Sequence, residues 1–297
     1  MPDFPRSLIE FQRRFPDEEA CAEYLLALRW PNGFVCPACQ QSKGWRCETK
    51  PWTWECAHCH RQTSVTAGTV MHGSKLPLTT WFWAAYLMAT HSNGISALQV
   101  WKQLGLGSYK SAWLLCAKLR RAMVDPQRSL LAGLVEVDET AIGYRTRDEP
   151  PAGGQGRSLQ GKMMVVGAVE VIGKGPGRIR LAAIKDCSAA SLHAFVAKNI
   201  TPGAVAKTDG WRGYTDAPGV EHQPHVVGSM AAHVVLPRVH RIFANLKTWA
   251  LGVYHGTPQR PHSLHVSDPR FALFNIKRDI LRFLSMGFGT ICLMGNR

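Results

Sequence analysis

The sequence predicts an α/β protein in which a mixed sheet carries helices on its faces. Two stretches precede this sheet: a cysteine-rich module near the N-terminus and a segment of helical periodicity that begins at Leu78. The third observation is the order of elements after Pro126, where apolar strand-like runs come first and then alternate with a helix-like run. This order favours one layered α/β unit over an all-helical or all-strand protein.

The composition describes a globular and strongly basic protein. The chain has 297 residues, 45% hydrophobic and 19% charged, which is enough for one large core with smaller modules beside it. Its 35 Lys and Arg outnumber its 21 Asp and Glu, and the formal net charge is +14. This charge favours a polyanionic partner, above all nucleic acid, because each neutralised phosphate releases a counterion. A solvated basic surface is the alternative.

The N-terminal residues and the length of the apolar runs predict a cytoplasmic protein. The chain begins with "MPDFPRSLIEFQRRF", which contains acids and lacks the apolar stretch of a secretory signal. No window reaches the roughly 18 uninterrupted apolar residues of a membrane span, so no membrane is expected as a partner. In a reducing compartment, nine cysteines are better explained by metal binding and core packing than by disulfides.

Four cysteines have the spacing of a zinc ribbon. Two CxxC pairs are separated by sixteen residues, so two knuckles can close one tetrahedral Zn²⁺ site. The predicted ligands are Cys36, Cys39, Cys56 and Cys59. A module this small needs the metal because it cannot bury enough apolar surface to fold alone. A redox-active CxxC is the alternative, although that motif normally occurs singly. Substitute ligands remain open nearby, namely Cys47, His58 and His60.

The next module, residues 76–126, resembles a helix-turn-helix. Apolar positions with helical spacing flank the turn "LGLGS" and are Ile95, Leu98, Trp101, Ala112, Leu115 and Leu119. Thr79 and Ser108 are predicted as helix caps. Four basic residues are expected to face DNA phosphates while the second helix enters a groove, namely Lys110, Lys118, Arg120 and Arg121. A plain three-helix bundle would show the same apolar stripe and remains an alternative.

The remaining runs predict the sheet and one of its helices. Strand-like runs are "GLVEVDETAIG", "KMMVVGAVEVIG" and "GRIRLAAIKDC", followed by the helical "ASLHAFVAKNI" and a short strand in "AVAKTDGWRGY". Between the first two strands, "RTRDEPPAGGQGRSLQGK" is rich in Gly and Arg. We expect a mobile connection near phosphate at this place.

Asp138 and Asp209 are the candidate catalytic carboxylates. Each is predicted at the end of a central strand, so neighbouring strands could bring the two together although 71 residues separate them. Two ionised carboxylates at close range repel unless a cation joins them, and their hard oxygen ligands suit Mg²⁺ or Mn²⁺. Such ions, about 3.5–4 Å apart when paired, can activate the attacking oxygen and stabilise the leaving oxygen of a phosphodiester. Glu136 and Glu139 are the competing assignments; on a strand Glu136 shares the face of Asp138, and Glu139 points away.

A third site residue is expected from a later helix. In "LPRVHRIFANLKTWALGVYHG" an apolar stripe that would pack on the sheet comprises Val239, Ile242, Phe243, Leu246, Ala250 and Leu251. His240 and Lys247 lie seven residues apart, two helical turns, and therefore share a face. His240 is a candidate metal ligand or proton carrier, and Lys247 is a candidate phosphate contact. A solvated helix face is the alternative for this pair.

The order of ribbon, helical segment, "VEVDET", "GAVE", "KTDGWRGY" and "LKTWALGVYHG" resembles the insertion-sequence transposases with an N-terminal zinc ribbon and an RNase-H-like catalytic domain. The resemblance spans approximately residues 17 to 256. It implies that Asp138 and Asp209 are the metal-binding carboxylates of a DDE-type site. It places the variable third position of that site at His240 and the lysine two turns later at Lys247, which gives a DDH-K pattern.

The resemblance also implies a division of the chain into five parts. These are an N-terminal helical segment (1–32), the zinc ribbon (33–70), the helix-turn-helix-like segment (76–126), the RNase-H-like domain (130–257) and a divergent tail (258–297). In the tail, three prolines oppose the continuous helix that the family has there. His240 replaces a carboxylate by a nitrogen donor, so a preference for Mn²⁺ over Mg²⁺ is a further hypothesis.

For activity, the resemblance implies cleavage of transposon ends and attack of the freed 3′-hydroxyl on target DNA. The partners would be double-stranded DNA, as terminal inverted repeats and target, and further copies of the chain on paired ends. A prokaryotic cytoplasmic protein, associated with the nucleoid when bound to DNA, is expected. Two alternatives stay open: an RNase-H-like nuclease that cuts without joining strands, and a catalytically dead DNA-binding regulator.

Overall fold

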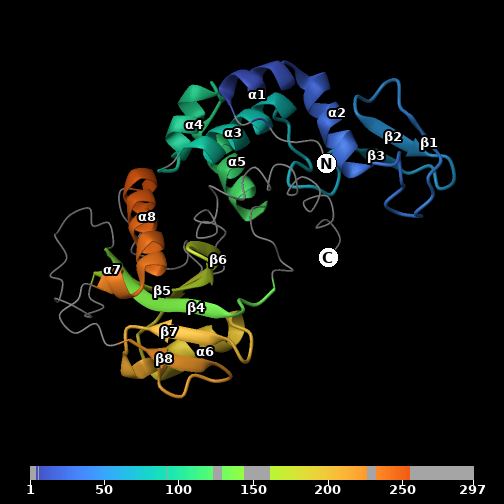
Figure 1. The fold of residues 1–297 in the computed structure, drawn as a ribbon. Helices are drawn as coiled ribbons and strands as arrows, with labels where there is room; N and C mark the ends of the chain where they lie inside the picture. The colour runs from blue at the N-terminus through green and yellow to red at the C-terminus, as the bar shows by residue number, and fades with distance from the viewer. Residues whose placement is uncertain are drawn as a thin grey trace. The chain divides into compact units, whose positions relative to one another are not determined.

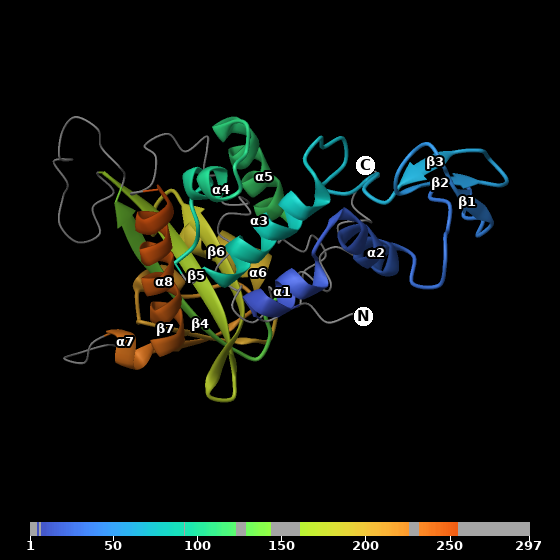
Figure 2. The ribbon, with the colours of Figure 1, turned by 90° about the horizontal axis from the view of Figure 1, so that it is seen from above.

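The computed structural model describes residues 5, 7–91, 93–122, 129–143, 161–225 and 232–254. They fall into two compact units (Figures 1 and 2). The first unit contains the residues up to 91 together with 97–122, and the second contains 93–96 and the described residues from 129 to 254. Most of the Gly- and Arg-rich connection and the whole of the predicted tail lie outside the described residues.

Two capped helices open the first unit. α1 (Leu8–Arg14) begins with a capping box, in which a serine hydroxyl and a glutamate carboxylate bond each other's backbone N–H groups. α2 (Glu18–Arg29) begins after Asp17, whose carboxylate accepts a backbone N–H of the first turn. Glu18 and Glu19 lie in that turn. Because the positive end of the helix dipole lies there, these acids stabilise α2.

The ribbon is a three-stranded antiparallel sheet. Its strands, in spatial order, are β1 (Gly44–Arg46), β2 (Thr53–Cys56) and β3 (Gln62–Ser64). Arg29 at the end of α2 donates to the carbonyl oxygens of Val65 and Ala67 at 2.9 and 2.7 Å. These bonds join the ribbon to the helix that precedes it.

Three helices complete the first unit, namely α3 (Leu78–Thr90), α4 (Ala97–Gln103) and α5 (Tyr109–Ala122). Ser108 caps α5, because its hydroxyl accepts the N–H of Ser111 at 3.2 Å. The prediction that Thr79 caps α3 is wrong, since this helix begins one residue earlier. The Glu18 carboxylate takes the cap position and accepts the N–H groups of Leu78 and Thr79 at 2.8 and 2.7 Å.

The apolar stripe of the helix-turn-helix-like segment is largely as predicted. Ala112, Leu115 and Leu119 of α5 are buried, and so is Ile95 before α4. Leu98 is the exception, with 47% of its surface exposed. The short helix α4 buries Ala97 and Val100 instead. These two residues are three positions apart and share one face of the helix, and Leu98 does not lie on that face.

The second unit is built on a five-stranded mixed sheet, which confirms the predicted fold class. Its spatial order is β6-β5-β4-β7-β8. The strands are β4 (Leu134–Gly143), β5 (Lys162–Ile172), β6 (Gly175–Ile184), β7 (Val205–Thr208) and β8 (Glu221–Pro224). β4, β5 and β6 pair antiparallel, whereas β7 pairs parallel with β4 and with β8. The central strand β4 therefore joins an antiparallel half to a parallel half.

Helices cover both faces of this sheet (Figures 1 and 2). They are α6 (Ala189–Asn199), the 3₁₀ turn η1 (Arg212–Tyr214), α7 (Ala232–Val235) and α8 (Pro237–Tyr254). Val135 and Val137 pack with residues of α6, whereas Ile142 and Val165 pack with residues of α8. The stripe predicted for α8 is buried except at Leu251, which is 62% exposed. Trp249 and Val253 complete the inward face instead.

Candidate functional site

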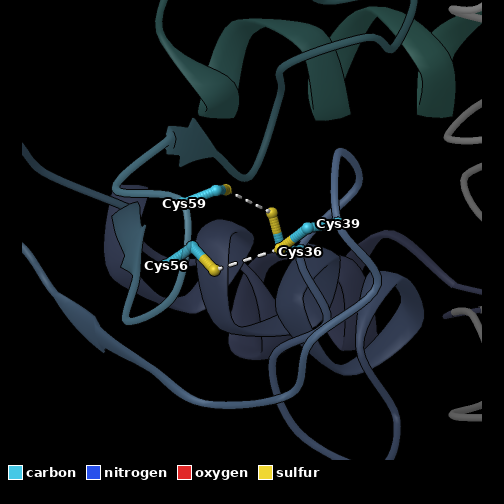
Figure 3. Close-up of side chains that lie close together, drawn as sticks. All are labelled: Cys36, Cys39, Cys56 and Cys59. Atoms are coloured by element: carbon cyan, nitrogen blue, oxygen red, sulfur yellow. Dashed lines mark hydrogen bonds between the residues drawn. The ribbon is translucent and has the colours of Figure 1, made fainter.

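Four cysteine sulfurs meet between the two knuckles of the ribbon (Figure 3). The residues are Cys36, Cys39, Cys56 and Cys59, and their sulfurs all lie within 4.8 Å of one another. Two of the contacts are 3.5 and 3.6 Å long. In a tetrahedral Zn²⁺ site with Zn–S bonds near 2.3 Å, neighbouring sulfurs lie about 3.8 Å apart. The predicted ligands therefore fit one zinc ion.

The three substitute ligands do not join this group. Cys47, His58 and His60 are absent from the cluster formed by the described residues. His60 lies instead with its Nδ1 3.7 Å from the Glu55 carboxylate. The alternatives that the spacing left open are thus resolved in favour of the two CxxC pairs.

The backbone of the first knuckle favours the thiolate form of Cys36. Burial raises the pKa of Cys36, but backbone N–H groups of Cys39 and Ala38 point at its sulfur and hold the pKa at about 6. Four thiolates at this distance repel one another unless a cation joins them. A cluster so arranged is suited to bind a divalent metal ion rather than to exist as free thiols.

Asp138 lies in the middle of a strand, not at its end. It is the fifth residue of β4, which continues to Gly143. The parallel neighbour β7 is shorter and ends at Thr208, with Glu136 aligned to Lys207. The parallel part of the sheet therefore ends beside Asp138, which is where a site is expected in sheets of this kind.

Asp209 follows β7 directly. Continuing the register of β4 and β7 by two residues places it opposite Asp138. Its carboxylate accepts the N–H of Trp211 at 2.9 Å across a tight turn. Gly210 makes this turn with φ +82°, a conformation that side chains disfavour. Strand register and turn together bring Asp209 to the neighbourhood of Asp138.

His240 reaches Asp138 from α8. Its Nε2 lies 3.1 Å from Asp138 Oδ2. This nitrogen is buried and makes no hydrogen bond within the described part of the chain. Adjacent ligand atoms about 2.1 Å from an octahedral cation lie about 3.0 Å apart. The donor atoms of Asp138 and His240 therefore fit neighbouring positions on one Mg²⁺ or Mn²⁺ ion.

A glycine allows α8 to lie this close. Gly167 of β5 is the register partner of Asp138. A Cβ atom at Gly167 would lie 2.7 Å from the Phe243 ring, closer than real contacts allow. Since Phe243 is one turn from His240 on α8, the missing side chain lets the helix bring its histidine to the sheet.

Two predicted site residues are not gathered with these. Among the described residues, Asp209 does not complete a three-residue metal group with Asp138 and His240, because the cysteine cluster is the sole such group there. Lys247 lies on α8 with an exposed side chain, two turns from His240. The structure thus joins one carboxylate and the histidine directly, whereas Asp209 follows the strand next to that of Asp138.

Tyr214 and Arg238 are polar residues near the site that sequence reasoning missed. The Tyr214 hydroxyl donates to Glu139 at 2.7 Å on the sheet face opposite Asp138. Burial and then the negative charges of Glu139, Asp138 and Asp209 raise the pKa of Tyr214 well above its ordinary value. The motif "TDGWRGY" contains Tyr214 and was the available signal, but its partner lies 75 residues away.

The four basic residues of the helix-turn-helix-like segment differ in exposure. Lys110 and Arg121 are exposed, and Lys118 is partly exposed with its Nζ 5.8 Å from the centre of the Trp81 ring. Arg120 is only 4% exposed, so the structure does not present it to a phosphate. Arg120 is next to the buried Leu119 and lies with it on the inward side of α5. Lys110, Lys118 and Arg121 remain candidates for DNA contact.

Comparison with known proteins finds a family match for the ribbon and another for the unit that carries the sheet. Residues 130–265 match the ISXO2-like transposase domain, and residues 16–62 match the transposase zinc-ribbon domain. A protein of the transposable element ISH50 in Halobacterium salinarum, described as uncharacterized, is 25% identical over 290 residues, covering 91% of this chain and 94% of that one. None of the described helices is long and apolar enough to cross a membrane.

A zinc ribbon joined to a mixed α/β unit of this kind defines a protein that processes nucleic acid. The two family matches together cover more than half of the chain, with the four ribbon cysteines inside one of them and the predicted sheet inside the other. The chain therefore carries two domains of insertion-sequence transposases, a transposase zinc-ribbon domain and an ISXO2-like transposase domain. The ribbon domain and its four-cysteine cluster support a structural Zn²⁺ ion.

Proposed function

We propose that this transposase cleaves the ends of its element and joins the freed 3′-hydroxyl to target DNA by divalent-metal phosphodiester chemistry. The carrying observation is the 3.1 Å contact between Asp138 Oδ2 and His240 Nε2, with Nε2 buried and making no hydrogen bond in the described part of the chain. A ring nitrogen and a carboxylate oxygen this close repel when the nitrogen carries a lone pair, unless a proton or a metal ion joins them. A metal ion is the ligand that both atoms favour.

Each site residue has a role in this proposal. Asp138 and His240 hold the cation, and Asp209, beside Asp138 by strand register, supplies the second carboxylate. When bound, Mg²⁺ or Mn²⁺ would activate the attacking oxygen and stabilise the leaving oxygen of the phosphodiester. Lys247, exposed two turns further along α8, contacts a phosphate of the DNA.

The basic charge and the two small modules supply the DNA contacts. The formal net charge of +14 favours binding of a polyanion such as DNA. The ribbon and the helix-turn-helix-like segment bind the terminal inverted repeats, with Lys110, Lys118 and Arg121 as candidate phosphate contacts. Assembly of several copies on two paired ends completes the proposal, because both ends must be cut before joining.

The test is incubation of the purified protein with end DNA of its own element and Mg²⁺ or Mn²⁺. We compare the wild type with Asp138→Asn and Asp209→Asn, and use Asp216→Asn, at an exposed position, as the control for charge. Metal-dependent nicking and joining that both site variants lose and the control keeps would support the proposal. Nicking without joined products would indicate a nuclease, and DNA binding without any cleavage would indicate a regulator.

A further inference from the structure

Glu136 connects the strand that carries Asp138 to the helix that carries His240. Its carboxylate is 1% exposed and accepts three hydrogen bonds. Two come from backbone N–H groups of Arg238 and Val239 in the first turn of α8, at 2.8 and 3.0 Å. The third comes from the Arg238 guanidinium at 2.9 Å. One buried carboxylate thus holds both the backbone and a side chain at the start of α8.

The position of this contact in the sequence matters as much as its strength. Glu136 is two residues before Asp138 on β4, so both side chains lie on the face that α8 covers. Arg238 is two residues before His240 on α8. The bonds of Glu136 therefore fix the first turn of α8 against β4 within one pleat of the Asp138–His240 contact. A rotation of α8 that moved His240 would also break these bonds.

A second glutamate in the same sheet makes the same kind of contact without touching the site. Glu170 of β5 is 5% exposed and also bonds an arginine side chain, that of Arg178. It accepts backbone N–H groups from Ala132 and Arg178 at 2.7 and 3.3 Å. Both glutamates therefore satisfy a buried charge in the same way. They differ in what they hold, since Glu170 joins the start of β6 and the segment before β4, whereas Glu136 joins α8.

We propose that Glu136 is a positioning residue that holds His240 Nε2 against Asp138 and so sets the affinity of the site for its divalent cation. It acts through α8 and does not touch the reacting atoms. The inference rests on the proposed function, in which Asp138 and His240 share one metal ion. Outer partners that orient metal ligands typically change metal affinity by roughly 10–100-fold when they are lost.

The experiment is a double-mutant cycle on Mn²⁺ affinity, measured by electron paramagnetic resonance of free Mn²⁺ with the zinc-loaded full-length protein. The variants are Glu136→Gln, His240→Ala and the double variant, with Glu170→Gln as the matched control. We expect Glu136→Gln to weaken Mn²⁺ binding about tenfold in the wild type and to have no further effect in His240→Ala. Glu170→Gln should leave Mn²⁺ affinity unchanged, although it should lower the melting temperature about as much as Glu136→Gln does.

Three results would overturn the inference. An equal loss of affinity from Glu136→Gln with and without His240 would show a general effect on the fold, and so would an equal loss from Glu170→Gln. If His240→Ala bound Mn²⁺ like the wild type, Glu136 could not act through His240. In that case Asp138→Asn tells failure of this inference from failure of the proposed function. If Asp138→Asn loses Mn²⁺ binding, the carboxylate does hold the ion, and only the role of His240 is refuted.

A milder variant decides the question if Glu136→Gln does not fold. Arg238→Lys keeps the positive charge and both backbone bonds of Glu136, and Arg238 is already partly exposed at 23%. We expect it to weaken Mn²⁺ binding by several-fold, again only when His240 is present. Unchanged affinity in a folded Arg238→Lys protein would refute the role of the Glu136–Arg238 pair.

Discussion

The zinc ribbon and the candidate site on the sheet are assembled in opposite ways. The ribbon takes its four ligands from two knuckles that lie within 24 residues of one another, and all four sulfurs are within 4.8 Å. The site on the sheet takes Asp138, Asp209 and His240 from three elements that are up to 102 residues apart, and it is only partly gathered. Local spacing thus defines the first site. The second depends on strand register and on how closely α8 packs.

The largest effect is expected from breaking the ribbon site. Cys56→Ser removes one of the two buried ligands, and zinc binding supplies roughly 10–16 kcal/mol to the folding of such modules. We expect loss of zinc and unfolding of β1 to β3, measured as zinc content per chain and as amide NMR signals of the ribbon. Cys47→Ser, outside the cluster, is the matched control and should keep its zinc. Zinc retained in Cys56→Ser would refute the four-cysteine assignment.

The next effect tests the packing on which the second site depends. Gly167→Ala places a methyl group 2.7 Å from the Phe243 ring, so α8 must shift away from Asp138. Overpacking of this kind costs roughly 1–3 kcal/mol, and we expect Mn²⁺ affinity to fall about tenfold with it. Urea unfolding and Mn²⁺ titration measure the two effects. Gly143→Ala has open space and is the control. Normal Mn²⁺ binding by Gly167→Ala would mean that close packing of α8 is not needed.

The same contrast explains how far the sequence could predict this molecule. The ribbon ligands follow from CxxC spacing because each knuckle is a local turn, and the mixed sheet follows from the order of strand and helix runs. Asp138 was placed at the wrong point of its strand, because the sequence cannot show that β7 stops opposite the middle of β4. The hydrogen bonds of Glu136 to Arg238 span 102 residues and have no local signal.

Other misses have the same cause. Thr79 is a good cap by residue type, but Glu18 from another helix takes that place. Arg120 fits a basic helix face by composition and is nevertheless buried, since burial depends on what α5 packs against. Residue type and spacing are local properties. Tertiary packing decides which distant residue caps a helix, which charges are buried and where a strand meets a helix. The sequence pattern does not contain this information.

A smaller effect is expected on metal preference. His240 offers a nitrogen donor where two oxygen donors would suit Mg²⁺ better, so the wild type should prefer Mn²⁺. We expect His240→Glu to shift the ratio of Mg²⁺-supported to Mn²⁺-supported DNA cleavage towards Mg²⁺ by several-fold. His240→Asn removes the imidazole without adding charge and should lower activity with both ions. An unchanged ratio in His240→Glu would exclude His240 from the metal site.

The smallest effect is expected from pH, through the buried carboxylate of Glu170. Burial raises the pKa of Glu170, but the hydrogen bonds from Arg178 and the Ala132 backbone outweigh it, so the net pKa is lowered. A carboxylate whose pKa is lower in the folded state stabilises the fold above its unfolded pKa, and this stability is lost as pH falls through the folded pKa. The free energy of unfolding should therefore decrease from about pH 5 downward, and less steeply in Glu170→Gln. Urea unfolding at successive pH values measures the slope, and identical slopes in the two proteins would show that Arg178 does not hold Glu170 ionised.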